Sequence, residues 1–350
     1  MTDLATRYLG LDLRNPLVAS ASPLSGTADG VRRLADGGVG AVVLPSLFEE
    51  QLREQAARDA AVADTGAESF AESLSYFPAA ASANGGPGRY LSLLKRAAAA
   101  VDIPVIASLN GATAGGWTDY ASALQDAGAA AIELNIYYLP GDLPPIAPHL
   151  PAPPHPAFVP GSDVEQRHVD ILTTVKAVVN VPVAVKLGPY FSSTGEMARR
   201  LDRAGADGLV LFNRFLQPDI DPETLTVTVR PGLSTQAEGR LPRAWIALLA
   251  GRVRASLAAT TGVETAADVA RYLLAGADVV MSASALLRHG PGYADVMLGE
   301  LSAWLARKGF GSVAEARGLL AVPDGTDQAA YERAAYVTAL EEANRGYGPW

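Results

Sequence analysis

The chain has 350 residues, of which 49% are hydrophobic and 19% charged, with a formal net charge of -9 and no cysteine. This composition suits a large core in one barrel-sized domain or two smaller ones, and its acidic balance argues against binding nucleic acid or an anionic membrane through general electrostatics. The lack of cysteine excludes disulfides, thiolate metal sites, iron–sulfur clusters and a cysteine base. No basic N-terminal segment precedes a long apolar stretch, and no apolar run approaches a membrane span, so the sequence predicts a cytoplasmic protein.

A phrase of small residues followed by an apolar run recurs at residues 37–41, 127–131, 204–208 and 275–279. Glycine just past a helix end accepts the left-handed conformation that other residues resist, so each copy predicts a helix end and a strand start. The apolar runs are typical of parallel strands covered on both faces. The predicted strands are 17–20, 41–44, 105–109, 131–135, 183–187, 208–212, 256–260 and 279–282. Eight strands alternating with alanine-rich helices predict an α/β fold, a single (β/α)8 TIM barrel.

Three insertions interrupt this regular pattern, at about 48–89, 139–161 and 217–240, within one predicted domain that spans residues 1–350. Long loops at the carboxyl face of a barrel are usually lids, so we expect lids here. The second insertion carries much of the proline and also His149 and His155. In the third, residues 225–230 alternate threonine with Leu and Val, which predicts one strand of an exposed ribbon. The alternative is a surface ribbon without a functional role.

Small polar residues and one lysine stand at the predicted carboxyl ends of the strands, where TIM barrels carry their chemistry. They include Ser20, Ser46, Ser108, Asn135, Lys186 and Asn213. The loops after the last two strands, around Thr261–Gly262 and Ala283–Ser284, have the composition of a phosphate cradle, because they offer hydroxyls, backbone N–H groups and the start of a short helix. Helix capping by Thr261 and Ser284 is the alternative. No metal site is predicted.

Lys186 ends a buried strand, where a lysine is costly without an anionic partner. That partner is either Glu133 on the neighbouring strand or a cofactor or substrate that becomes anionic during reaction. Asn135 and Asn213 can recognise a planar ring that bears amide groups, although singly such residues often satisfy a loop backbone.

Several segments resemble the dihydroorotate dehydrogenase family, and they occur in the same order along almost the whole chain. They are 15–22, 132–135, 185–191, 220–223, 261–268 and 275–286. The resemblance implies an FMN cofactor at the barrel mouth, with Lys186 beside the pyrimidine edge of the flavin to stabilise its reduced anion. It also implies a role in pyrimidine biosynthesis and a homodimeric assembly. The implied cofactor-binding residues are Ser20, Ala21, Ser46, Ser108, Asn135, Lys186, Asn213, Gly239, Thr261, Gly262, Ala283 and Ser284.

The chain departs from the family pattern in residues that concern chemistry. Family members carry a cysteine or serine base after the strand-four asparagine, and Tyr138 occupies that position here. Pro45 stands where the members without a membrane extension have a lysine. A phenol is a weak base at neutral pH but a suitable acid, so Tyr138 is expected to donate a proton to the substrate. The alternative is that Tyr137 and Tyr138 only pack the lid. The predicted catalytic residues are Tyr138, Lys186, Asn135 and Asn213.

These expectations favour an FMN-dependent oxidoreductase that acts on a CH–CH bond of a small planar substrate, such as dihydroorotate or another dihydropyrimidine or enoate. One alternative is a flavin-free barrel that binds a phosphorylated metabolite and acts as a lyase or isomerase through a Schiff base on Lys186. Another is a non-catalytic flavin-binding relative. The substrate, the direction of reaction and a separate electron-transfer partner remain open at this point.

Overall fold

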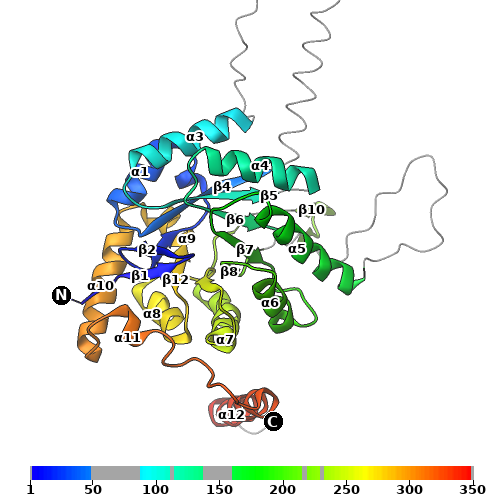
Figure 1. The fold of residues 1–350 in the computed structure, drawn as a ribbon. Coiled ribbons are helices and arrows are strands. Elements are labelled where there is room, and N and C mark those ends of the chain that lie inside the picture. Colours follow the sequence, from blue (N-terminus) through cyan, green and yellow to red (C-terminus); the bar gives the residue numbers. More distant parts are fainter. Residues whose placement is uncertain are drawn as a thin grey trace, which may run out of the picture.

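A computed structural model describes residues 2–48, 87–110, 114–136, 160–214, 219–228 and 232–347. Eight parallel strands close into a barrel, with helices packed around its outside (Figure 1), which confirms the predicted fold. In spatial order, the barrel strands are β11 (Ser256–Ala259), β12 (Val279–Ser282), β3 (Leu17–Ala19), β4 (Ala41–Phe48), β5 (Val105–Asn110), β6 (Ala131–Asn135), β7 (Val183–Leu187) and β8 (Gly208–Leu211). The principal helices are α1 (Ala28–Asp36), α3 (Pro87–Ala100), α4 (Ala114–Asp126), α5 (Gly161–Lys176), α6 (Thr194–Arg203), α7 (Arg240–Leu249), α8 (Ala266–Ala275), α9 (Ser284–His289), α10 (Tyr293–Lys308), α11 (Val313–Ala316) and α12 (Gln328–Tyr347).

The repeated glycines adopt the conformation that the sequence predicts. Gly38, Gly128, Gly205 and Gly276 follow α1, α4, α6 and α8 with φ values of +102°, +96°, +94° and +115°. Residues other than glycine resist this left-handed region. Each of these glycines therefore ends its helix and turns the chain toward the next strand of the barrel. A continuous hydrophobic core then forms between the barrel strands and the surrounding helices.

Strand β4 is longer than predicted, since it continues through Pro45 and Ser46 to Phe48. Its pairing with β5 shifts register between Val43 and Ser46. Proline has no N–H to donate to the ladder and is tolerated at such an irregularity. The extension brings Ser46 to the barrel mouth, opposite Ser108.

A hairpin that the sequence analysis does not predict closes the other end of the barrel. Strands β1 (Thr6–Tyr8) and β2 (Leu11–Leu13) pair antiparallel and lie across the near end of the barrel in Figure 1. Tyr8, Leu9 and Leu13 are buried against the interior side chains of the strands. The side chain of Leu9 fits against Gly208, where a Cβ atom would lie 2.5 Å from Leu9 Cδ2. The hairpin therefore forms the floor of the barrel.

The predicted ribbon is present: β9 (Asp219–Asp221) pairs antiparallel with β10 (Thr226–Thr228), and Ile220, Leu225 and Val227 are exposed. Most of the insertions 48–89 and 139–161 lies outside the described residues. The described elements next to them are β4, which ends at Phe48, α3, which begins at Pro87, and α5, which begins at Gly161. That one domain spans residues 1–350 remains a prediction.

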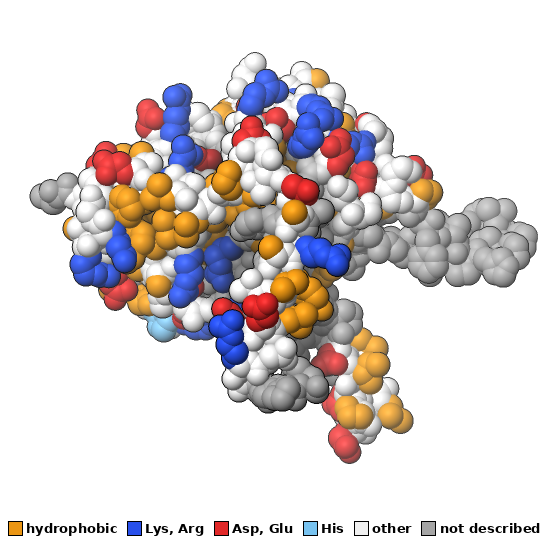
Figure 2. All heavy atoms as spheres, turned by 90° about the horizontal axis from the view of Figure 1, so that it is seen from below, with side chains coloured by type: hydrophobic (Ala, Val, Ile, Leu, Met, Phe, Trp, Pro, Cys, Tyr) orange, Lys and Arg blue, Asp and Glu red, His pale blue; other side chains and the backbone are white. Residues whose placement is uncertain are grey.

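The face shown in Figure 2 carries Lys and Arg side chains interspersed with Asp and Glu rather than gathered in one basic patch. Helix α12 lies apart from the barrel in Figure 1. Within the described ranges, no helix has both the length and the apolar character that a bilayer crossing requires.

Candidate active site

A cleft of about 220 Å³ opens at the carboxyl ends of β3, β7, β8, β11 and β12. The two charged residues among those that line it are Lys186 and Arg214, both cationic, although the whole chain has a net charge of -9. Hydroxyl groups supply most of the other polar atoms. The lining residues are Ser20, Ala21, Ser22, Pro23, Lys186, Phe212, Asn213, Arg214, Leu233, Ser234, Thr260, Thr261, Val263, Met281, Ser282, Ala283, Ser284 and Leu287. This lining favours an anionic ligand.

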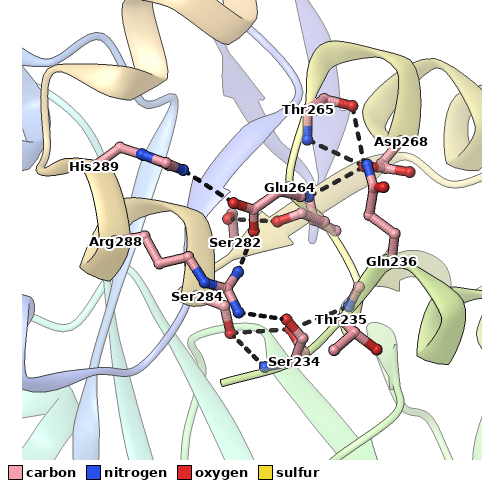
Figure 3. Close-up of polar contacts among 12 residues, drawn as sticks. Ser234, Thr235, Gln236, Glu264, Thr265, Asp268, Ser282, Ser284, Arg288 and His289 are labelled. Atoms are coloured by element: carbon pink, nitrogen blue, oxygen red, sulfur yellow. Dashed lines mark hydrogen bonds and ion pairs between the residues drawn. The ribbon is translucent and has the colours of Figure 1, made fainter. Parts of the chain in front are cut away.

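Hydrogen bonds between Ser234 and Ser284 organise one corner of the cleft (Figure 3). The Ser284 hydroxyl accepts from the Ser234 backbone N–H at 3.0 Å and from the Ser234 hydroxyl at 2.9 Å. The Gly262 N–H donates to Ser234 Oγ at 3.3 Å. Arg288 donates to the Ser234 carbonyl at 2.9 Å and pairs with Glu264, whose carboxylate His289 also contacts. The loops after β8, β11 and β12 therefore meet in one fixed arrangement.

Neither Thr261 nor Ser284 caps a helix, so the capping alternative is wrong. Helix α8 is capped by Thr265, and the N-cap position of α9 is Ala283. The Thr261 hydroxyl instead donates to the Phe212 carbonyl at 3.1 Å. Both hydroxyls thus belong to the wall of the cleft.

Gly262 and Gly239 lie backbone to backbone behind this corner. Thr261 and Gly262 have φ values of +78° and +70°. The Tyr272 hydroxyl, which contacts the Thr261 carbonyl at 2.6 Å, supports the turn from below. A Cβ atom on Gly262 would lie 2.6 Å from the Gly239 nitrogen, so a side chain does not fit there.

We expect Gly262→Ala to lower the free energy of unfolding by about 2–4 kcal/mol, since it adds a backbone clash to the cost of a positive φ. Gly251→Ala is the matched control, because Gly251 has a φ of +77° and no atom within 4 Å of the added Cβ. The control should lose about 1 kcal/mol. Urea unfolding of both variants measures the difference, and equal losses would show that the contact with Gly239 is unimportant.

A row of hydrogen bonds links four strand ends beside the cleft. Asn213 Nδ2 donates to Asn135 Oδ1 at 2.6 Å, and Asn135 Nδ2 donates to Ser46 Oγ at 3.0 Å. Ser46 Oγ in turn lies 2.9 Å from Ser108 Oγ. Each amide has two N–H donors and this row uses one of them, so both asparagines can still donate to a ligand.

Lys186 contacts Glu133, one of the two partners that the sequence analysis considers. Its Nζ lies 3.4 Å from Glu133 Oε1, and the two side chains are 10% and 1% exposed. Lys186 also lines the cleft. The pair with Glu133 is therefore a finding, and contact between Lys186 and a ligand stays a prediction.

The structure gathers most of the predicted site residues. Seven of the twelve predicted cofactor-binding residues line the cleft, namely Ser20, Ala21, Lys186, Asn213, Thr261, Ala283 and Ser284. Ser46, Ser108 and Asn135 form the adjoining row, while Gly239 and Gly262 support the phosphate-cradle corner from behind. Tyr138, Tyr137, His149 and His155 lie outside the described residues.

Arg214 and Ser234 line the cleft but are absent from the predicted set. Arg214 directly follows Asn213. Its position next to a predicted strand end is the sequence signal that could have identified it as a site residue. It pairs with Glu238 at 3.0 Å. Ser234 had no comparable signal, because it lies inside the predicted lid at 217–240 and far from any predicted strand end.

Comparison with known proteins agrees with this arrangement. The family model described as dihydroorotate dehydrogenase matches residues 3–305. The chain is 29% identical over 324 residues to a dihydroorotate dehydrogenase B (NAD(+)), catalytic subunit, of Methanothermobacter thermautotrophicus, covering 90% of this chain and 98% of that protein. Proteins of the same name from Listeria welshimeri and Shouchella clausii are 32% and 30% identical, each over 51% of this chain.

The chain spans 56% of the length of each of these last two relatives. The family match, in contrast, runs from the floor hairpin through all eight barrel strands and into α10. It covers well over half of the chain and every described residue of the cleft. The chain therefore belongs to the dihydroorotate dehydrogenase family.

Proposed function

We propose that this protein is an FMN-dependent oxidoreductase that acts on a CH–CH bond of a small planar substrate. The observation that carries the proposal is the cleft itself, in which Lys186 and Arg214 are the charged lining residues and hydroxyls surround one corner. A net-negative chain that places two cations and a hydroxyl-rich corner at its barrel mouth is suited to an anionic cofactor. Family membership supports the same reading.

The residues present fit FMN. The corner made by Thr261, Ser234 and Ser284 offers hydroxyls and N–H groups to a phosphate. Ser20 and Ala21 also line the cleft. Asn213, Asn135 and Ser46, in the row beside the cleft, would also contact the bound cofactor. When bound, FMN would supply two-electron hydride chemistry.

The protein's own residues have three tasks in this scheme. Lys186 holds a positive charge at the edge of the cleft, where it stabilises negative charge that develops on reduction. Asn135 and Asn213 bind and orient amide-bearing rings through their remaining donors. Tyr138 donates a proton to the substrate carbon that does not receive hydride.

The relatives are named for dihydroorotate, yet Tyr138 stands where the family carries a cysteine or serine base. We therefore propose another dihydropyrimidine or an enoate as the substrate class, with dihydroorotate as the reference compound. A homodimer and a separate electron-transfer partner remain part of the proposal.

The pair between Lys186 and Glu133 disfavours the flavin-free alternative. A Schiff base needs a lysine amine that is free to attack a carbonyl carbon, whereas Lys186 Nζ lies 3.4 Å from the buried Glu133 Oε1. The lyase or isomerase reading is therefore the weaker one.

The test is the flavin content of the purified protein. We expect a yellow protein with about one FMN per chain, and we expect the apoprotein to bind FMN at least ~100-fold more tightly than riboflavin, because two or more hydrogen bonds to a charged phosphate are each worth ~1.5–3 kcal/mol. Titration calorimetry of the apoprotein with both compounds gives the ratio. FAD in the purified protein, no flavin after reconstitution, or equal affinity for FMN and riboflavin would each contradict the proposal.

A further inference from the structure

A second pocket, of about 380 Å³, adjoins the cleft beside the start of α7. The cleft and this second pocket, which we call the side pocket, have four lining residues in common, so they are neighbouring compartments of one site. The shared residues are Phe212, Asn213, Arg214 and Thr261. A ligand that occupies the cleft can therefore extend into the side pocket.

The side pocket carries a net positive charge, because its charged lining residues are Arg214, Glu238 and Arg240. Glu238 pairs with Arg214 at 3.0 Å and accepts hydrogen bonds from the N–H and hydroxyl of Thr235 at 2.6 and 3.0 Å. Burial alone would raise the pKa of Glu238, but the hydrogen bonds from Thr235 and the charge of Arg214 lower it. Glu238 is therefore ionised at neutral pH and balances the charge of Arg214.

Arg240 is the cation that remains. It is the first residue of α7 and is exposed, and its side chain has no hydrogen-bond or ion-pair partner within the described part of the chain. Arg214 and Arg288, the other arginines around the cleft, both pair with carboxylates. A planar guanidinium offers donors in a fork that matches the two oxygens of a carboxylate. Arg240 is thus available to a carboxylate that comes from outside the chain.

The other walls of the side pocket are largely apolar. Pro189 and Tyr190 follow β7, while Leu241 and Pro242 follow Arg240 in α7. Tyr190 and Leu241 are 44% and 50% exposed, so a ligand in the side pocket would cover apolar surface that now faces solvent. Apolar walls with a single unbalanced cation match an apolar group that ends in a negative charge.

We propose that the side pocket binds an apolar arm of the substrate that ends in a carboxylate. Arg240 contacts this carboxylate while the reacting CH–CH bond lies in the cleft, so Arg240 determines specificity and takes no part in the chemistry. The inference rests on the proposed function, because it takes a CH–CH substrate beside FMN as given. Dihydroorotate carries its carboxylate directly on the ring and has no arm, so it would leave the side pocket unfilled.

The experiment measures binding of matched probes to the FMN-loaded protein by titration calorimetry. One series of probes is built on uracil and the other on a trans-enoate, the unsaturated forms of the two proposed substrate classes. Each core carries no arm, a pentanoate arm or a pentanamide arm. In at least one series the pentanoate probe should bind ~10-fold more tightly than the pentanamide probe, because charge-assisted hydrogen bonds are about twice as strong as neutral ones. The same titration should change the absorbance of the flavin, since the core lies beside it.

Arg240→Gln should abolish this preference, so that the pentanoate and pentanamide probes bind with equal affinity. Arg240→Lys should retain part of it, because lysine keeps the charge but lacks the fork of donors. Arg307→Gln is the matched control. Arg307 is exposed on α10, lines neither compartment and likewise has no ion-pair or hydrogen-bond partner among the residues described. Its variant should keep the parental preference.

Equal affinity of the parent for both arms in both series overturns the inference, as does a preference that survives in Arg240→Gln or disappears in Arg307→Gln. Tight binding of the pentanoate probe without a change in flavin absorbance also overturns it, because the core would then lie outside the cleft. Loss of FMN from Arg240→Gln would mean that Arg240 serves the cofactor instead. A parent without FMN refutes the proposed function, whereas an FMN-loaded parent that binds both arms equally refutes only this inference.

Discussion

Lys186→Met is expected to lower the free energy of unfolding of the apoprotein by about 3–5 kcal/mol. The substitution keeps much of the side-chain volume but leaves the Glu133 carboxylate buried, 1% exposed, without its cation. Breaking a buried pair by removing one partner typically costs this much, and the loss is a large fraction of the ~5–15 kcal/mol that stabilises a typical protein. Guanidinium unfolding of the flavin-free protein measures the effect without any contribution from the cofactor.

The double variant Lys186→Met/Glu133→Met should recover most of this loss, because replacing both partners of a buried pair by apolar residues is often neutral or stabilising. Lys176→Met is the control. Lys176 and Asp207 are 30% and 35% exposed, so breaking this pair should cost at most about 1 kcal/mol. A loss below 1 kcal/mol in Lys186→Met, or no recovery in the double variant, would show that Glu133 does not depend on Lys186.

The geometry of Lys186 shows why one residue can serve the fold and the proposed chemistry together. A lysine that only stabilised Glu133 could lie away from the cleft, and a lysine that only met a ligand would need no buried carboxylate. Lys186 lies one residue before the end of β7, beside Asn135 of β6, where its side chain contacts Glu133 and the residue lines the cleft. Each function constrains the position of the same ammonium group.

The sequence predicts the barrel well because its signals are local. The glycine that follows each repeated helix end needs a positive φ whatever its distant neighbours are, and the apolar runs after it have a suitable length for buried strands. The floor hairpin is missed for the opposite reason. Strands of three residues are too short to show a period, and Tyr8, Leu9 and Leu13 are specified by the barrel interior that they fill. The extension of β4 through Pro45 likewise depends on its pairing with β5.

The residues of the candidate site likewise divide into those with a local sequence signal and those without one. Ser20, Asn135, Lys186 and Asn213 are found because strand ends in a parallel barrel must meet at one face. Ser234 is not found, since its place in the cleft depends on hydrogen bonds to Ser284, fifty positions away. The sequence also could not decide whether Lys186 contacts Glu133 or a ligand in the cleft. The same strand pattern is compatible with both.

Tyr138→Phe is expected to slow the step that hydrogenates the substrate by ~10²–10⁴-fold, the usual scale of general acid–base catalysis. Tyr138 lies outside the described residues, three positions after Asn135, the last residue of β6. Flavin binding and flavin reduction by an external donor should remain nearly unchanged. Stopped-flow measurement of the two half-reactions separates these effects.

Tyr137→Phe is the matched control, because it removes the neighbouring phenol hydroxyl and keeps the ring. If both rings only pack a lid, neither substitution should change the rate by much, since phenylalanine preserves the packing. If Tyr138 is the acid, only its own variant should be slow. Tyr138→Cys and Tyr138→Ser should in addition create dihydroorotate oxidation that the parent lacks, because they restore the type of base that the family carries at this position. A parent that oxidises dihydroorotate at ordinary enzymatic rates would refute the proposal that Tyr138 marks a different substrate, since the cysteine or serine would then be unnecessary.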